Sequence, residues 1–253
     1  MSIEIIRPQI SPRFHSDTAD VIFLSSDRVK FHIHRKNLES TTAAFPGPEF
    51  RLTQGEIVPL TESAGTLELL FQFSYPQRQP ELTKVGFEKI VPLAEAVEKY
   101  EVFPAMPACY RMMEMHIRTN PAEVFAYAGK HGYNDLADEA APLLIGKPLN
   151  QMFKLLPPAL ALPWVSYREQ WLQVLQAAYA KPVGYHSNCG AWRILMTNIM
   201  QKLSMQLGSL SDVKQIFAPP GANTRNCCSS YLVAWQQSVE ENIKKIRKFS
   251  TFL

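Results

Sequence analysis

The stretch VKFHIHRKNL, residues 29–38, decides the fold. Successive side chains of a strand point to opposite sides, so the first part of this stretch divides into an apolar face and a polar face. The apolar face carries Val29, Phe31 and Ile33. The polar face carries Lys30, His32 and His34, and we expect it to meet water or a partner. Residues 36–44 favour a helix, so the sequence predicts a strand that passes directly into a helix.

Two further short strands are predicted on either side of this stretch. Residues 20–24, DVIFL, form a β-branched and aromatic run, and a turn-forming segment at 25–27 separates them from residue 29. This arrangement predicts a hairpin. Residues 56–60, EIVPL, predict another strand, and Pro59 indicates an edge or a strand end because proline donates no ladder hydrogen bond. We therefore expect a small three-stranded sheet.

Helical periodicity dominates the rest of the chain. In the first half, apolar stripes predict helices over 66–75, 87–97 and 104–115, with a kink or an interruption at Pro92. Beyond Asn120 no segment shows a strand pattern. Stripes there predict helices over 122–131, 136–145, 167–180, 191–207 and 231–249. The expected fold class is α+β, with a mixed unit at 1–120 and an all-helical extension at 121–253 packed on or beside it.

Composition and charge argue against several classes of function. The 253 residues carry a net charge of +3, which creates no broad field to attract a phosphate backbone, so we expect no direct contact with nucleic acid. No apolar run reaches the roughly 20 residues of a membrane helix, and the opening MSIEIIRPQISPRF has no long signal-peptide core. Four irregularly spaced cysteines fit a reducing compartment. We expect an intracellular protein, cytoplasmic or nuclear, with no membrane association.

Motifs that would indicate catalysis are absent from the sequence. It contains no G-x-S-x-G elbow, no G-x-x-x-x-G-K-S/T loop and no G-x-G-x-x-G turn, so we expect neither an enzyme nor a cofactor. Asp135, Asp138 and Glu139 follow Gly132, and we expect them to form a solvated helix face, with Asp135 near the helix start.

The last predicted helix is amphipathic, with apolar residues on one side and charged residues on the other. We expect it to dock on the preceding helices. A partner-binding helix, or a weak membrane-surface contact through the basic end at 244–248, is the alternative.

An ordered set of residues within 15–120 resembles the BTB/POZ domain, in the form found in large fungal families of the basidiomycete type. The set comprises Ala19-Asp20-Val21, Phe31-x-Ile33-His34-Arg35-x-x-Leu38, Glu56-Ile57-x-x-Leu60, Leu67-x-x-Leu70-Phe71-x-Phe73-x-Tyr75-Pro76 and Ala94-x-x-x-x-Lys99-Tyr100-x-Val102. Residues 121–133 resemble the helical part that follows the domain in those fungal proteins.

The resemblance implies a protein-binding function. BTB domains bind proteins, usually as homodimers or as adaptors, so we expect a non-enzymatic, self-associating adaptor or scaffold. Family-motif candidates for the interaction site are Asp20, Phe31, His34, Arg35 and Leu38, and apolar surface candidates are Ile3, Ile5 and Ile6.

Two alternative functions follow from the same resemblance. One is a substrate adaptor of a cullin-3 ubiquitin ligase, and the other is an indirect regulator of transcription. The hydrophobic-x-Glu element with which several members contact cullin has no clean counterpart here, because Glu81 follows Gln79 and Pro80.

Two groups of residues are candidates for metal binding, and we expect neither to bind one. His32 and His34 supply two of the four ligands that a structural zinc needs. In the BTB/POZ interpretation the ring of His34 instead donates to a backbone carbonyl and accepts from another group at the strand-to-helix junction. The second group is His186, Cys189, Cys227 and Cys228, whose spacing matches no standard zinc module. Unpaired thiols are the expectation there, and a bridge from Cys189 to Cys227 or Cys228 is the alternative.

Overall fold

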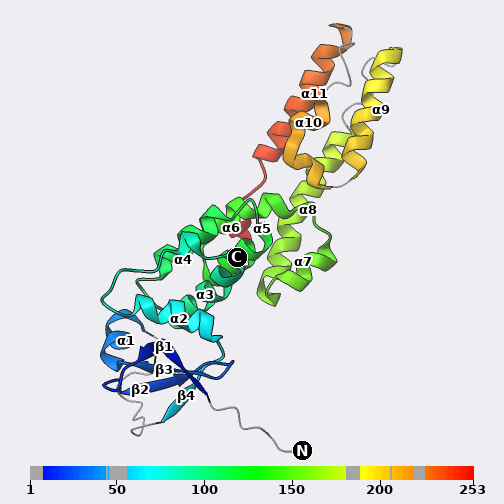
Figure 1. Ribbon diagram of the computed structural model, residues 1–253. Helices are drawn as coiled ribbons and strands as arrows, with labels where there is room; N and C mark the ends of the chain where they lie inside the picture. Colours follow the sequence, from blue (N-terminus) through cyan, green and yellow to red (C-terminus); the bar gives the residue numbers. More distant parts are fainter. Residues whose placement is uncertain (1–7, 44, 46–55, 181–188, 206, 219–225) are drawn as a thin grey trace, which may run out of the picture. The chain divides into compact units, whose positions relative to one another are not determined.

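The chain divides into two compact units, Met1–His116 and Ile117–Leu253. The computed structural model describes residues 8–43, 45, 56–180, 189–205, 207–218 and 226–253 (Figure 1). The division lies close to residues 120 and 121, where the loss of strand patterns in the sequence indicated a boundary. The first unit is mixed α and β, and every described element of the second is helical, so the α+β class is confirmed.

The sheet of the first unit has four strands in the order β1-β3-β2-β4. They are β1 (Gln9–His15), β2 (Val21–Leu24), β3 (Val29–Ile33) and β4 (Ile57–Pro59). The hairpin is confirmed, because β2 and β3 pair antiparallel with Val21 opposite Ile33 and Leu24 opposite Lys30. β1 and β4 pair in parallel with their neighbours and form the two edges.

The predicted three-stranded sheet is wrong by one strand, β1. Its sequence QISPRFH does not alternate, and it buries only Ser11 and Phe14, three residues apart. A register shift between β1 and β3 accounts for that spacing, since a bulge breaks the period of two. Both edge strands contain a proline, Pro12 and Pro59, which interrupts the free row of donors that an edge presents.

The helices of the first unit lie on one side of the sheet (Figure 1). They are α1 (Arg35–Thr41), α2 (Ala64–Phe73), the short 3-10 segment η1 (Leu82–Lys84), α3 (Phe87–Lys99) and α4 (Met106–Met115). The predicted interruption at Pro92 is absent, because α3 continues through it to Lys99. Proline removes one helical hydrogen bond, and burial of Leu93 and Val97 on the same helix stabilises the turns that follow.

The core of the first unit is aromatic and centres on Phe71 of α2, which is fully buried. Four other rings surround it, with centroids 5.8 Å (Phe14), 5.4 Å (Phe23), 5.6 Å (Phe31) and 6.0 Å (Phe45) from its own. Three of these rings come from β1, β2 and β3, so one helical side chain joins the three strands. Aromatic pairs at these separations contribute about 0.5–1.5 kcal/mol each beyond the area they bury.

The described elements of the second unit are all helices. They are α5 (Pro121–His131), α6 (Asn134–Ala140), η2 (Ala141–Leu144), α7 (Leu149–Leu155), α8 (Pro158–Ala180), α9 (Gly190–Met205), η3 (Leu207–Asp212), α10 (Val213–Phe217), α11 (Asn226–Lys244) and η4 (Phe249–Phe252). Neither α7 nor α10 was predicted, and α8 begins nine residues before its predicted start. Prolines at 157, 158 and 163 interrupt the helical pattern, but Pro158 occupies the first position of α8, where its missing N–H is not needed.

The C-terminal segment leaves the helix earlier than the sequence predicts, because side chains of other helices bind its backbone. Gln170 of α8 accepts from the Arg247 N–H at 3.0 Å and donates to the Arg247 carbonyl at 3.3 Å. Asp138 accepts from the Ser250 N–H at 2.7 Å and from its hydroxyl at 2.8 Å. The fully buried Phe249 packs against Phe125, with ring centroids 4.6 Å apart. The prediction that Asp138 lies on a solvated face is therefore wrong.

We predict that Asp138→Ala destabilises the second unit by about 1–3 kcal/mol, because it leaves the Ser250 donors without their carboxylate. Chemical denaturation monitored by tryptophan fluorescence measures this, since all four tryptophans lie in that unit. Asp135→Ala, at an exposed position on the same helix, is the control and changes stability little. Equal losses from the two variants would show that the contact with Ser250 contributes nothing.

Candidate functional site

The family-motif residues gather where β3 passes into α1. The Asp20 carboxylate accepts a hydrogen bond from the Arg35 N–H at 2.7 Å, and so caps the first turn of α1. Phe31 and Leu38 are buried in the core beneath. The structure thus brings together four of the predicted site residues, Asp20, Phe31, Arg35 and Leu38, in a junction that supports the fold.

His34 occupies the N-cap position of α1 and binds two hydroxyl groups. Its ring Nδ1 lies 3.0 Å from the Tyr75 hydroxyl and its Nε2 lies 2.9 Å from the Thr18 hydroxyl. The Tyr75 hydroxyl also accepts from the His34 N–H at 3.1 Å. The prediction of a bond from the ring to a backbone carbonyl is therefore wrong, although the position at the junction is right. His32 and Lys30 alternate with the buried Phe31 and Ile33 and are half-buried.

A second cluster joins the start of α2 to the end of α3. The Glu62 carboxylate accepts from Lys99 Nζ at 2.8 Å and from the Tyr100 hydroxyl at 2.7 Å. Lys99 also donates to the Thr61 hydroxyl at 2.9 Å. The ring of Tyr100 stacks on that of Phe45, with centroids 4.4 Å apart. The Lys99-Tyr100 pair of the family pattern therefore has a structural role here.

Ionisation in this cluster follows burial and pairing. Burial acts to raise the pKa of Glu62, but hydrogen bonds from Lys99 and Tyr100 outweigh it, and the pKa lies below its ordinary value. Burial raises the pKa of Tyr100 to about 12. Burial acts to lower the pKa of Lys99, but the hydrogen bonds with Glu62 and Tyr100 outweigh it, so the pKa of Lys99 lies above its ordinary value. These groups stabilise one another in the charge states they hold near neutral pH.

Only some of the candidate residues for apolar contact and for metal binding lie in the described part of the chain. Ile3, Ile5, Ile6 and His186 lie outside the described residues, as does the side chain of Cys227. Within the described part of the chain, no group of three or more His, Cys, Asp or Glu side chains is placed to hold a metal ion. Cys189 and Cys228 do lie together, with Sγ atoms 3.7 Å apart. Cys109 is fully buried, and burial raises the pKa of its thiol to about 12.

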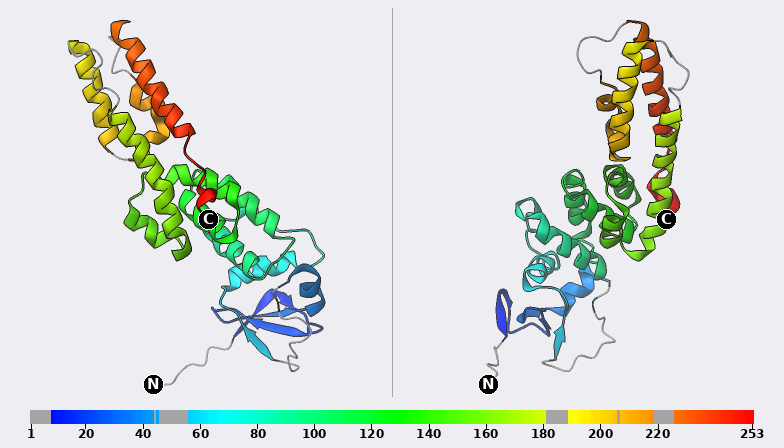
Figure 2. Two further views of the ribbon diagram at one scale, coloured as in Figure 1. Left: turned by 180° about the vertical axis from the view of Figure 1, so that it is seen from behind. Right: turned by 90° about the vertical axis from the view of Figure 1, so that its right-hand side faces the viewer.

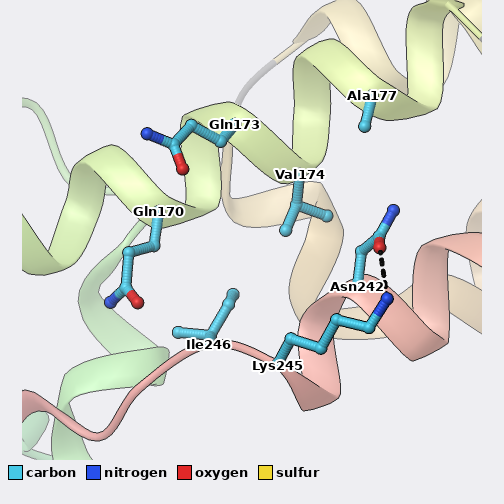
Figure 3. Close-up of a pocket in the computed structure, with 7 residues that line it drawn as sticks. All are labelled: Gln170, Gln173, Val174, Ala177, Asn242, Lys245 and Ile246. Atoms are coloured by element: carbon cyan, nitrogen blue, oxygen red, sulfur yellow. Dashed lines mark hydrogen bonds between the residues drawn. The ribbon is translucent and has the colours of Figure 1, made fainter.

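Each unit has a surface hollow that is formed by described residues. One, of about 250 Å³, lies between α8 and the end of α11 (Figure 3), and is lined by Gln170, Gln173, Val174, Ala177, Asn242, Lys245 and Ile246. The other, of about 450 Å³, lies between the first turns of α2 and α3 and includes Glu68, Lys84, Glu88 and Lys89. Among the residues described, no histidine or cysteine lines either hollow. The hydroxyl side chains of Ser63 and Thr66 also line the second hollow.

Several large apolar side chains of α7 and α8, in the second unit, are exposed to solvent. Phe153 and Leu155 of α7 and Leu162 and Val165 of α8 are 47%, 43%, 75% and 37% exposed. We call these four residues the α7–α8 cluster, after the two consecutive helices that carry them (Figure 1). These four residues were not predicted, because no helix was predicted between residues 145 and 167. Apolar residues in excess of a single stripe at 153–165 are the signal that would have identified them.

The first unit exposes single apolar residues at the edges of its sheet. Ile10 of β1 is 53% exposed and Ile57 of β4 is 38% exposed. β1 is also fixed to α2, because Glu68 accepts from the Ser11 hydroxyl at 2.7 Å and pairs with Arg13 at 3.2 Å. Glu81, at the position considered for cullin contact, pairs with Lys84 at 2.7 Å.

Comparison with known protein families finds no family that matches this chain, and comparison with curated proteins finds no match either. In the part of the chain that the structure describes, no helix combines the length and the apolarity required to cross a membrane.

We predict that Glu62→Gln lowers the free energy of unfolding by about 1–2 kcal/mol at pH 7, because Lys99 and Tyr100 lose a charged acceptor. A carboxyl whose pKa is lowered by folding contributes stability above its unfolded pKa, and this stability is lost as the pH falls through the folded value. The difference between the variant and the wild type should therefore shrink below about pH 4. Denaturation curves across pH 3–7 measure it, with Glu39→Gln on the exposed face of α1 as the control. A difference that is constant with pH would contradict the assignment.

Proposed function

We propose that this chain is a non-enzymatic protein-interaction module of the BTB/POZ type, which self-associates and acts as an adaptor or scaffold. The observation that carries the proposal is the α7–α8 cluster, in which large apolar side chains are exposed to solvent. Fully burying such a side chain contributes about 1.5–3 kcal/mol. A partner that covers part of each of the four side chains therefore gains binding free energy from them.

Spacing within the cluster favours a protein partner over a small ligand. Leu162 and Val165 are three residues apart on α8, so they are neighbours on one helical face. Pro163 lies between them and fixes the local backbone, which reduces the entropy lost on binding. Neither of the two hollows described above is lined by any of the four residues.

Self-association is the second element of the proposal, and it concerns the first unit. The element order hairpin, helix, edge strand and helices agrees with the BTB/POZ resemblance. Ile10 is exposed on β1, next to the segment whose isoleucines were expected to form the contact. Burial of Ile10 against a second copy supplies part of the energy of such a dimer.

A non-enzymatic role agrees with the location of the groups whose pKa values are strongly shifted. Tyr100, Cys109 and Tyr167 are raised to about 12 chiefly by burial. Because their pKa values lie far above neutral pH, all three groups are uncharged near pH 7. None of the three lines either of the two hollows. A catalytic acid or base has a pKa close to the pH at which the enzyme works, whereas the pKa values of these three groups lie far above it.

We predict concentration-dependent self-association of the full chain at micromolar concentration, measured by size-exclusion chromatography with light scattering. Ile10→Asp should raise the dissociation constant of the dimer at least about tenfold, because it places a charge on a side chain that the second copy buries in the proposed dimer. Ile57→Asp, at the opposite edge of the same sheet, is the matched control and should leave it unchanged. A strict monomer at high micromolar concentration, or an equal effect of the two variants, would overturn the proposed dimer.

A further inference from the structure

Two cysteines that are distant in sequence lie together at the start of two helices in the second unit. The Sγ atoms of Cys189 and Cys228 are 3.7 Å apart, although the residues are separated by 39 positions. Cys189 directly precedes α9, and its carbonyl accepts from the Arg193 N–H at 3.1 Å. Cys228 lies in the first turn of α11. A disulfide requires sulfur atoms about 2.05 Å apart, so the two sulfurs must move closer than their present contact before they can bond.

The contact between α9 and α11 exists without any crosslink. The two helices run side by side (Figure 2). Trp192 of α9 packs against Tyr231 and Trp235 of α11, with ring centroids 6.1 Å and 6.3 Å apart. Trp235 also donates from its indole nitrogen to the Ala178 carbonyl of α8 at 3.0 Å. The same interface that holds these rings together also holds the two thiols in contact.

The two thiols differ in access to reagents. Cys228 is only 1% exposed, whereas Cys189 is half-buried. A dissolved oxidant therefore meets Cys189 first.

We propose that Cys189 and Cys228 form a reversible disulfide, with a low-molecular-weight disulfide such as oxidised glutathione as the oxidant. The Cys189 thiolate attacks one sulfur of glutathione disulfide, the sulfur–sulfur bond of the reagent breaks, and one glutathione thiolate leaves. The Cys228 thiolate then attacks the Cys189 sulfur in this mixed disulfide and displaces the second glutathione. The protein loses two electrons and two protons, and the oxidant is reduced to two glutathione thiols.

The crosslink would stabilise the end of the second unit where α9 and α11 begin. It closes a loop of some forty residues, and closure of a loop of that size restricts the unfolded chain. Oxidised protein should therefore melt at a higher temperature than reduced protein, by roughly 5–15 °C for a unit of this size.

The test equilibrates the full-length protein in buffers of graded oxidised and reduced glutathione, alkylates the remaining thiols under denaturing conditions and identifies the bridge by peptide mass spectrometry. We expect a Cys189–Cys228 bridge that increases with the oxidised fraction and is reversed by reduced glutathione. Cys227→Ser should retain the bridge and Cys228→Ala should abolish it. Cys109→Ser, at the buried position in the first unit, is a further control and should retain it.

The oxidised and reduced wild-type forms are compared by thermal unfolding, which avoids any effect of a substitution on folding. A bridge to Cys227 in place of Cys228 would overturn the proposal. So would complete alkylation of both thiols at every ratio of glutathione, or equal melting temperatures of the bridged and reduced forms.

Discussion

The ring of Phe71 is the contact on which the first unit depends. It is fully buried on α2 and contacts rings from β1, β2 and β3 as well as Phe45. A small four-stranded sheet, in which β2 and β4 have only four and three residues, gains stability from a helix packed against one face. Phe71 provides this contact at the centre, and the polar networks of His34 and Glu62 fix the surrounding segments in register with it.

Those polar networks explain why conspicuous charged and ring-bearing residues of the first unit are structural. Asp20 caps α1, and His34 connects Thr18 to Tyr75. Glu62 joins Lys99 to Tyr100. Each network connects segments from different parts of the chain around the aromatic core. The α7–α8 cluster and the edge of β1, in contrast, expose apolar side chains to solvent.

Sequence periodicity could predict the elements that bury a regular stripe. The hairpin, α2, α3 and α5 followed from such patterns, because a strand or helix with one buried face repeats its apolar residues at a fixed period. β1 was missed because a bulge places its buried residues three apart. The start of α8 was missed because prolines at 157, 158 and 163 interrupt the helical pattern, while tertiary packing of Leu160 and Trp164 stabilises the helix there.

The candidate site was less predictable than the fold. The junction residues were identified by pattern, but whether a histidine supports a turn or binds a ligand depends on the hydroxyls it meets, and these come from residues 16 and 41 positions away. The role of Asp138 likewise depends on Ser250, which is 112 residues further along the chain. Which apolar residues of 153–165 stay exposed depends on how the helices pack, so the excess of apolar residues there indicates a surface without identifying its members.

The central claim, that this chain acts by binding other proteins through the α7–α8 cluster, is tested most directly by affinity purification of the tagged full-length protein from its native cells. Wild type is compared with Leu162→Asp and with Ile194→Asp, which alters a similarly exposed residue on α9. We predict a specific protein partner that copurifies with wild type and Ile194→Asp and is lost with Leu162→Asp, while untagged copies of the chain still copurify with all three. The same set of proteins captured by all three would contradict the account.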